Sequence, residues 1–333
     1  MSRRLLRLVL CLGIAAVPAG AAELPGTGRD AGRTVIYRDT WGVPHIYAPT
    51  IEAGLYAQGW AQAQDRPHEL LKNFKRALGE AAELDGPAML PFDMVSRVWD
   101  HYGTARRHAE RIRPVVRRHI QAYAHGMRDY YAAHPEDVPE WWAGREIDEY
   151  LIVAFGRLFL YAWSIEQVFA DLRRAGIDPG FGDYHHGSNQ WAVSPSRAAD
   201  GAAILLIDPH LSWWGLSRFW EFRIHAGDLH GSGFTLPGSP YIGLGHTNHL
   251  AWAMTTGGPD TADVYVLTLD PDDPTRYLHD DEWKSMTQRE FTIRVKGAGE
   301  RSFRTWETHL GPVIAMQDGK AYAARTAYAD SVG

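Results

Sequence analysis

The spacing of hydrophobic residues changes along this chain, and the change divides it into a helical first half and a strand-rich second half. Two runs of alternating residues around the Trp41-Gly42 turn predict a pair of strands between Thr34 and Tyr47. From Thr50 toward Ala82 apolar residues recur at helical spacing, and the same spacing returns over 105–134 and 146–175.

Residues 176–187 are rich in turn-forming residues, and we interpret them as an exposed connector. After them the residue pattern becomes typical of β-strands. We therefore expect residues 23–175 to form a helical region and 188–333 to form a strand-rich region, joined by a linker that is cut or removed. The predicted strands of the second region are 189–193, 202–207, 264–269, 291–295 and 303–308.

Residues 1–22 have the pattern of a secretory signal peptide. Arg3, Arg4 and Arg7 are positive, an apolar run follows, and Ala19-Gly20-Ala21 provides a small-residue cleavage site. The run is too short to span a membrane. We expect a periplasmic or secreted protein without a membrane anchor. The only cysteine, Cys11, would leave with the peptide, so the mature stability must come from packing or a bound ion.

The overall composition is that of a globular protein, with 45% hydrophobic and 22% charged residues. The formal net charge of −6 argues against a nucleic-acid partner. Aromatic residues are abundant, with 13 Trp and 15 Tyr. Such a supply suits an apolar pocket, and it equally suits a packed core.

Ser188 is the candidate nucleophile. A Gly-Ser pair in a loop usually marks a turn only, but here the serine lies at the boundary between the helical and β regions. The two strand segments that follow it are spaced as a hairpin, and Asp208-Pro209-His210 ends the second of them. His210 could therefore fold back beside Ser188.

Six motifs, taken in order, make the chain from about residue 34 to 325 resemble the penicillin amidase (penicillin acylase) family. That resemblance implies an N-terminal-nucleophile hydrolase with an α+β, four-layer αββα core, made as a precursor and split into two chains. The motifs are Arg-Asp-Thr-Trp-Gly-Val-Pro-His-Ile at 38–46, Ala-Gln-Ala-Gln-Asp-Arg at 61–66, Gly-Ser-Asn-Gln-Trp at 187–191, Asp-Pro-His-Leu at 208–211, Gly-Leu-Gly-His-Thr-Asn at 243–248 and Asp-Thr-Ala-Asp-Val-Tyr at 260–265.

The chemistry that the resemblance implies fits the residues. The Ser188 hydroxyl would attack the Gly187 carbonyl, and hydrolysis of the resulting ester would free the Ser188 amine. Gly187 has no side chain to block the approach. The freed amine then serves as the base that a triad histidine supplies elsewhere. An α-amine titrates near pKa ~7.7–8, close to working pH.

The resemblance also assigns an oxyanion donor, the backbone N–H of Thr256. The family's second donor is an Asn far downstream, beyond the end of this sequence, so we expect the 333 residues alone to be inactive. His210 occupies a position that the family fills with His or Gln near the nucleophile, where it would hold the serine amine or a bridging water. The alternative is a half-buried His that caps the turn after Pro209.

A structural calcium ion is the expected cofactor, and no organic cofactor is expected. Asp260, Asp263 and the Ala262 carbonyl supply hard oxygen ligands in one loop. By resemblance Asp171 is the further ligand, with Glu166 as the alternative. Without the family, two solvated turn aspartates would be the simpler interpretation. Adjacent His185 and His186 do not predict zinc, since neighbouring side chains rarely reach one ion.

The expected activity is hydrolysis of the amide between an apolar acyl group and a small amine, with the protein's own second chain as partner after cleavage. Penicillins, cephalosporins, acyl-homoserine lactones and acylated peptides remain possible substrates. The alternative is an inactive relic that binds acylated ligands. A conventional serine hydrolase is excluded because no Gly-x-Ser-x-Gly occurs. Candidate pocket residues, each equally compatible with core packing, are Trp163, Ile165, Leu211, Trp213, Trp214 and Tyr241.

Overall fold

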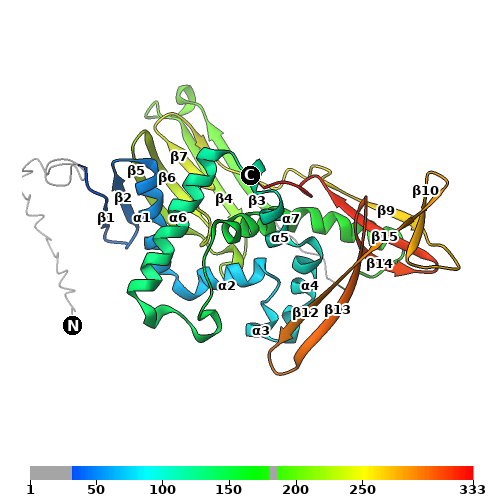
Figure 1. Cartoon of the computed structure of the whole chain (residues 1–333). Helices are drawn as coiled ribbons and strands as arrows, with labels where there is room; N and C mark the ends of the chain where they lie inside the picture. Colours follow the sequence, from blue (N-terminus) through cyan, green and yellow to red (C-terminus); the bar gives the residue numbers. More distant parts are fainter. Residues whose placement is uncertain (1–31, 181–186, 333) are drawn as a thin grey trace, which may run out of the picture.

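The computed structural model describes residues 32–180 and 187–332 (Figure 1). The predicted signal peptide and the pair His185 and His186 lie outside these residues. The α-helices of the described part are α1 (Ile51–Asp65), α2 (Pro67–Ala77), α3 (Ala82–Asp85), α4 (Leu90–Trp99), α5 (His101–Arg107), α6 (Pro114–Ala133) and α7 (Glu149–Arg174).

Strands dominate the second half of the chain, as the sequence predicts. They are β1 (Val35–Arg38), β2 (Pro44–Ala48), β3 (Gly187–Val193), β4 (Ile204–His210), β5 (Trp220–Ala226), β6 (Leu229–Thr235), β7 (Leu244–Thr247), β8 (Ala251–Trp252), β9 (Ala262–Thr268), β10 (Arg276–His279), β11 (Glu282–Ser285), β12 (Thr287–Val295), β13 (Gly299–Thr308), β14 (Gly311–Gln317) and β15 (Lys320–Thr326). The protein is of the α+β class.

One predicted helix is wrong in its extent. The stretch 105–134 is not continuous, because α5 ends at Arg107 and α6 begins at Pro114. Proline lacks the N–H that would bond to the preceding turn, so it is favoured in the first turn of a helix and not in its interior. The prediction for 146–175 is confirmed by α7, whose first turn is capped by the Asp148 carboxylate.

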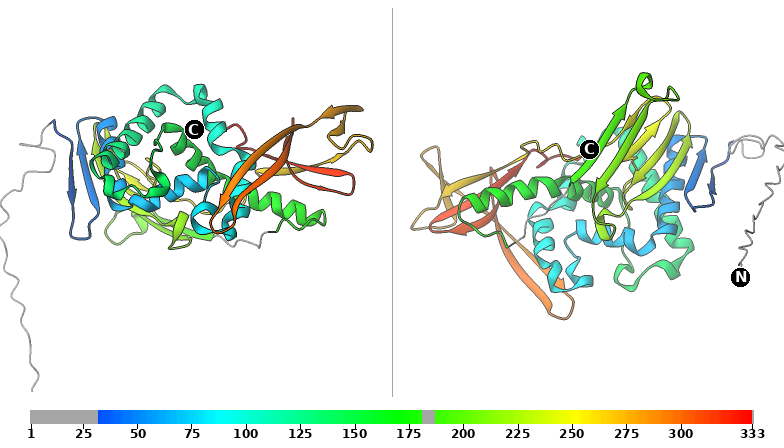
Figure 2. Two further views of the ribbon diagram at one scale, coloured as in Figure 1. Left: turned by 60° about the horizontal axis from the view of Figure 1, so that its bottom comes forward. Right: turned by 180° about the vertical axis from the view of Figure 1, so that it is seen from behind.

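A six-stranded sheet of order β1-β2-β5-β6-β7-β8 forms one end of the molecule (Figures 1 and 2). Helix α1 packs on one face of this sheet, against Ile46 and Ile224. Helix α6 crosses α1 so closely that two glycines are required. A Cβ on Gly59 would lie 2.1 Å from the Tyr123 carbonyl oxygen, and a Cβ on Gly126 would lie 1.9 Å from the Tyr56 carbonyl oxygen.

A five-stranded sheet of order β12-β13-β14-β15-β9 extends from the other end, and α7 packs on its β9 and β15 strands (Figure 2). The hairpin β3–β4 is a separate two-stranded sheet within the described residues. The four-layer αββα arrangement therefore stays a prediction.

Helix α7 is the central support of the second half. Among the described residues it has the length and composition of a membrane-spanning helix, but more than half of that apolar stretch is buried inside the molecule. Arg157, which is 3% exposed, donates to the carbonyl oxygens of Tyr328 at 3.2 Å, Ala329 at 3.0 Å and Ser331. These bonds fix the last described residues to α7.

A buried polar cluster ties α1 and α2 to the loop between β6 and β7. The side-chain oxygen Oε1 of Gln62 accepts from the Tyr123 hydroxyl and, at 3.0 Å, from the Gly238 N–H. The Gln62 amide donates to the Ser239 carbonyl at 3.3 Å, and Asn73 donates to the Pro237 carbonyl at 2.9 Å. Gln62 belongs to the Ala-Gln-Ala-Gln-Asp-Arg motif at 61–66, and its contacts hold parts of the fold together.

His101 makes stability sensitive to acid. It is fully buried, and burial, reinforced by the Arg157 charge, lowers its pKa from 6.5 to about 3. Its neutral form therefore contributes stability that is present above pH 6.5 and lost as pH falls toward 3, at up to about 1.4 kcal/mol per pH unit. We expect His101→Phe to remove this loss. Chemical denaturation of both proteins between pH 7 and pH 4 measures it, and parallel stability curves would contradict the expectation.

Candidate active site

Ser188 lies in the β3–β4 hairpin as the second residue of β3. The antiparallel register sets Gly187 opposite His210 and Ser188 opposite Pro209. Ser188 is half-buried, and its Oγ donates to the Gly187 carbonyl oxygen at 2.6 Å. Among the described residues, a Cβ on Gly187 would meet His210 Nδ1 alone, at 3.6 Å. The Ser188 hydroxyl therefore lies next to the Gly187 carbonyl group.

The loop 253–261 brings a second segment to Ser188. The Thr255 hydroxyl donates to the Ser188 carbonyl oxygen at 2.6 Å. The neighbouring Thr256 side chain accepts from Trp163 Nε1 of α7 at 3.4 Å. Three predicted site residues, Ser188, Thr256 and Trp163, are thus connected through one loop.

Helix α7 fixes that loop through an amide side chain. Gln167 donates to the Pro259 carbonyl at 2.5 Å and accepts from the N–H of Thr261 at 2.9 Å and from its hydroxyl at 2.8 Å. Ser164 adds a contact to the Thr261 hydroxyl at 2.9 Å. No acceptor for the Thr256 N–H occurs among residues 32–180 and 187–332. The role of this N–H as an oxyanion donor stays a prediction.

His210 lies beside Gly187 but forms its hydrogen bonds with other neighbours. Its Nε2 is 2.9 Å from Asp208 Oδ2 and 3.2 Å from Asn189 Nδ2. The hydrogen bond from His210, with a second from Asn189, lowers the pKa of Asp208, so this carboxylate stays ionised near neutral pH. The cluster orients the imidazole at the end of the hairpin that carries Ser188.

A pocket of about 230 Å³ adjoins this hairpin, and its lining includes Pro209, the residue opposite Ser188. The predicted pocket residues Leu211 and Trp213 both line it. Trp214 is 74% exposed. The guanidinium carbon of Arg218 lies over the Trp214 ring, 5.9 Å from the ring centre. The other lining residues are Ser212, Ser217, Arg218 and Phe219.

Two predicted pocket residues lie elsewhere. Ile165 is 9% exposed and belongs to a core cluster with Tyr161 and Val168, because it lies on the face of α7 that points into the molecule. Tyr241 follows β6 and lies near Arg113, whose charge opposes the rise in the Tyr241 pKa that burial causes.

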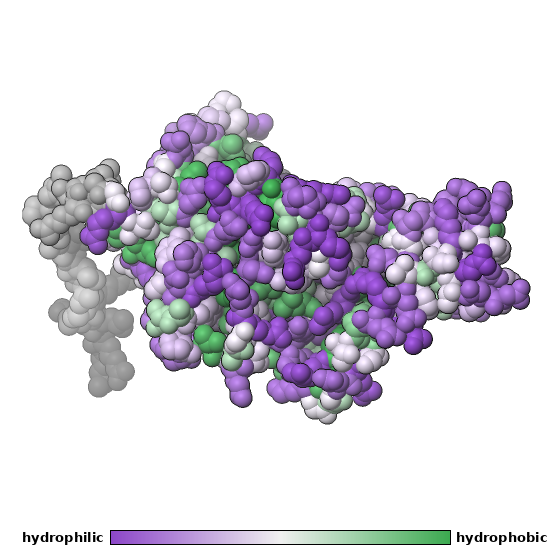
Figure 3. All heavy atoms as spheres, in the orientation of Figure 1, coloured by the Kyte–Doolittle hydropathy of each residue, from purple (hydrophilic) through white to green (hydrophobic). Residues whose placement is uncertain are grey.

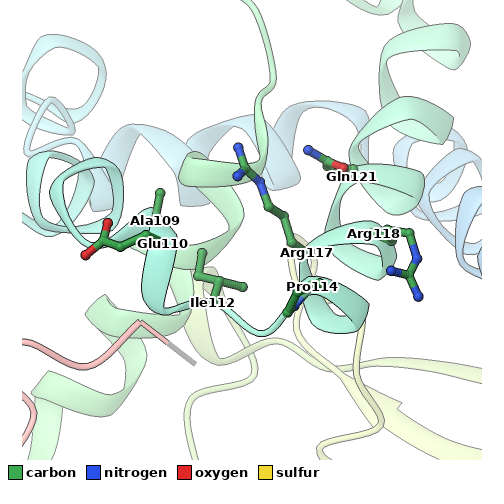
Figure 4. Close-up of a pocket in the computed structure, with 7 residues that line it drawn as sticks. All are labelled: Ala109, Glu110, Ile112, Pro114, Arg117, Arg118 and Gln121. Carbon is green, nitrogen blue, oxygen red and sulfur yellow. The ribbon is translucent and has the colours of Figure 1, made fainter.

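A larger cavity of about 420 Å³ lies before and along the start of α6 (Figure 4). Its lining comes from residues 109–121 and includes no residue of β3, β4 or the loop 253–261. The arginines Arg117 and Arg118 are paired with Glu149 at 3.1 Å and Glu52 at 3.7 Å. This cavity therefore takes no part in the chemistry at Ser188.

The predicted calcium ligands do not form a ready coordination shell. Asp171 forms an ion pair with Arg174 at 2.5 Å. Ala262 and Asp263 are the first two residues of β9, and Asp260 lies before that strand. In the described ranges no three His, Cys, Asp or Glu side chains are grouped closely enough to hold a metal ion. Calcium stays a prediction, and no step of the chemistry is assigned to it.

The sequence analysis did not identify several residues around Ser188 as site residues. Thr255, Gln167 and Asn189 each bond to a segment distant in the chain or to the histidine cluster. Asp208 carried a signal, since it begins the Asp-Pro-His-Leu motif. Thr255 and Gln167 carried none, because their roles depend on the meeting of α7 with the loop 253–261.

Comparison with known proteins identifies the family of the chain. A profile of the penicillin amidase family, "Penicillin amidase", matches residues 33–332. The chain is 28% identical over 342 residues to the acyl-homoserine lactone acylase PvdQ of Pseudomonas fluorescens (strain Pf0-1), covering 92% of this chain and 43% of that protein. It is 26% identical to the penicillin acylase 2 proenzyme of Pseudomonas sp. (strain SE83), covering 90% and 46%.

Other relatives match over shorter stretches. Penicillin G acylase of Escherichia coli is 29% identical over 166 residues, or 50% of this chain and 19% of that protein. The thermostable penicillin G acylase structure from Alcaligenes faecalis is 24% identical over 43% of this chain and 29% of that chain. Its TM-score of 0.39 is too low to support a statement about the fold.

The chain spans less than half the length of the curated relatives that match most of it. The family profile nevertheless covers nearly all of its described residues. The chain belongs to the penicillin amidase family, within the N-terminal-nucleophile hydrolases.

Proposed function

We propose that this protein is a self-processing acylase that hydrolyses the amide bond between an apolar acyl group and a small amine. The observation that carries the proposal is the position of the Ser188 hydroxyl, 2.6 Å from the carbonyl oxygen of Gly187. A hydroxyl held there needs little motion to reach the carbonyl carbon of the same peptide bond.

Processing would begin with attack of Ser188 Oγ on the Gly187 carbonyl carbon. The C–N bond breaks, an ester forms, and the Ser188 nitrogen leaves as an amine after taking up a proton. Water then hydrolyses the ester, which releases the Gly187 carboxylate and restores the hydroxyl. The product is a pair of chains, the second beginning at Ser188, that stay together as a heterodimer.

Turnover would use the same two groups. The Ser188 amine accepts the proton of the hydroxyl as Oγ attacks the substrate carbonyl, and it passes that proton to the leaving amine. The N–H of Thr256 would donate to the oxyanion. Water, deprotonated by the same amine, then attacks the acyl ester and frees the carboxylic acid.

The pocket beside Pro209 supports an apolar acyl group as the substrate's larger part. Leu211, Trp213 and Phe219 supply apolar surface, while Ser212 and Arg218 supply polar groups at its wall. Penicillins and acyl-homoserine lactones both contain an acyl chain joined to a small cyclic amine, and relatives named for each match this chain. An inactive relic that binds acylated ligands is the alternative.

Activity should be measured on the protein expressed from its complete reading frame. Apolar side chains on both strands of the β3–β4 hairpin are exposed, including Trp191 at 65% and Ile204 at 49%. Hydrolysis of a panel of chromogenic acyl amides with increasing chain length would rank the substrates. A fully processed protein that binds these amides without releasing product would favour the relic.

Thr255 should influence processing because its hydroxyl holds the Ser188 carbonyl. We expect Thr255→Val to slow the appearance of the cleaved chains about tenfold, since about 1.4 kcal/mol of positioning would be lost. Thr255→Ser keeps the hydroxyl and should process at nearly the wild-type rate. Time courses by gel electrophoresis measure both. Equal slowing by Val and Ser would mean that the hydroxyl is not the group that matters.

Calcium binding is proposed at Asp260, Asp263 and the Ala262 carbonyl, with Asp171 released from Arg174 to complete the shell. We expect 1 mM Ca²⁺ to raise the melting temperature of the processed protein, and Asp263→Asn to abolish most of that rise. Mg²⁺ should be less effective. An identical Ca²⁺ response in Asp263→Asn would remove this loop from consideration.

Export to the periplasm or beyond is proposed from the amino-terminal sequence. Fractionation of cells that express the complete protein should place it outside the cytoplasm, with the chain beginning near residue 23. Recovery in the cytoplasm with Arg3 and Arg4 still attached would contradict this proposal.

A further inference from the structure

Two histidines face each other on the side of the six-stranded sheet that α1 does not cover. Ile224 and Ala226 of β5 belong to the buried cluster beneath α1, so His225 between them projects to the opposite face. On the adjacent strand β6, His230 is the direct partner of His225 in the register. The two Nδ1 atoms are 3.2 Å apart.

The pair is held in place and open to solvent. The ring of Tyr47 on β2 stacks on His225, with the ring centres 4.8 Å apart and the planes at 15°. His225 is half-buried, whereas His230 is exposed. Burial, and then the charges of His230, His45 and Arg223, lower the pKa of His225.

We propose that His225 and His230 form a chelating site for a divalent late transition-metal ion. A tetrahedral ion bound to two imidazole nitrogens at 2.0–2.1 Å separates those nitrogens by about 3.3 Å. The Nδ1–Nδ1 separation already lies near that value, so binding requires almost no movement of the strands. This site is independent of Ser188 and of the proposed acylase activity.

The chemistry of the donors selects the ion. Imidazole nitrogen suits Cu²⁺ and Zn²⁺, while Ca²⁺ and Mg²⁺ prefer oxygen, and Cu²⁺ binds such sites more tightly than Zn²⁺. No third His, Cys, Asp or Glu joins the pair among the described residues, so water completes the coordination. In the metal-free pair one Nδ1–H donates to the other Nδ1. Binding moves that proton to Nε2 of the same ring, and no net proton is lost.

A second histidine pair in the molecule provides a matched control. His279 and His309 have ring centres 4.2 Å apart, closer than the 5.5 Å of His225 and His230. However, His309 Nδ1 is bonded to the Tyr277 hydroxyl at 2.7 Å, and His279 Nδ1 to Lys284 Nζ at 3.1 Å. Their Nδ1 atoms bond to other residues and not to each other, so proximity alone does not make that pair a site.

The test is titration calorimetry with Cu²⁺ and Zn²⁺ on tag-free protein, comparing wild type with His230→Asn and His279→Asn. We expect wild type to bind one ion. His230→Asn should bind that ion at least tenfold more weakly, and His279→Asn should bind it with the wild-type affinity. Circular dichroism should show that all three proteins are folded, since His230 is exposed. The electron paramagnetic resonance spectrum of bound Cu²⁺ should show one nitrogen donor fewer in His230→Asn than in wild type.

Equal affinity of wild type and His230→Asn for both ions would overturn the proposal. So would a loss of binding in His279→Asn as large as that in His230→Asn, because the ion would then reside elsewhere. Should His230→Asn fail to fold, His225→Asn is measured in its place with the same expected tenfold loss.

Discussion

Ser188→Ala is expected to leave the protein as one uncut chain and to abolish amide hydrolysis. Both reactions use the same Oγ, and removal of a nucleophilic serine costs roughly 10⁶-fold in turnover in comparable hydrolases. The methyl group is smaller than the hydroxymethyl group and Ser188 is only half-buried, so the fold should persist. Intact-mass measurement and a chromogenic amide assay check the two losses separately.

The matched control is Ser194→Ala. Ser194 directly follows β3 in the same hairpin and is exposed, and among the described residues its hydroxyl bonds only to the Ser196 hydroxyl, at 3.0 Å. This variant should process and turn over like wild type. A Ser188→Ala protein that still separates into two chains would assign the cleavage to another group or to a contaminating protease.

Gln62→Met is expected to destabilise the protein by about 3 kcal/mol. Gln62 is fully buried, and its amide joins the Tyr123 hydroxyl, the Gly238 N–H and the Ser239 carbonyl. Methionine fills a similar volume but leaves these groups without their partner, at a cost of about 1–3 kcal/mol for each buried group left unpaired. Urea unfolding of the variant and wild type measures the difference.

Gln58, one helical turn earlier on α1, is the control for this prediction. It is also fully buried, yet neither its amide nitrogen nor its oxygen has a partner in the described residues. Gln58→Met removes a polar group that makes no bond, so it should be neutral or stabilising by about 1 kcal/mol. Equal destabilisation by both substitutions would show that shape, and not hydrogen bonding, governs this helix.

Local sequence signals predicted the elements around the nucleophile well. The β3–β4 hairpin matches two short strand-forming runs that are spaced as a hairpin, and α7 matches the helical spacing of apolar residues over 146–175. The break before Pro114 was missed because apolar spacing continues on both sides of it, although the proline itself was visible.

The arrangement of distant segments could not be predicted in the same way. The Asp-Pro-His-Leu motif indicates that His210 lies near Gly187, but its bonding to Asp208 and Asn189 depends on side-chain rotamers. The approach of Thr255 to Ser188 depends on Gln167 and Ser164, which are 88 and 91 positions before Thr255. Such contacts arise from tertiary packing, which a single sequence does not record.

The measurement that tests the central claim most directly is the identity of the new amino terminus in wild-type protein made from the complete reading frame. Our account predicts a fragment that begins Ser188-Asn189-Gln190, with a free α-amine. Finding that the mature protein keeps the Gly187–Ser188 bond intact while hydrolysing amides would contradict it, because the base that we assign to the reaction would then not exist.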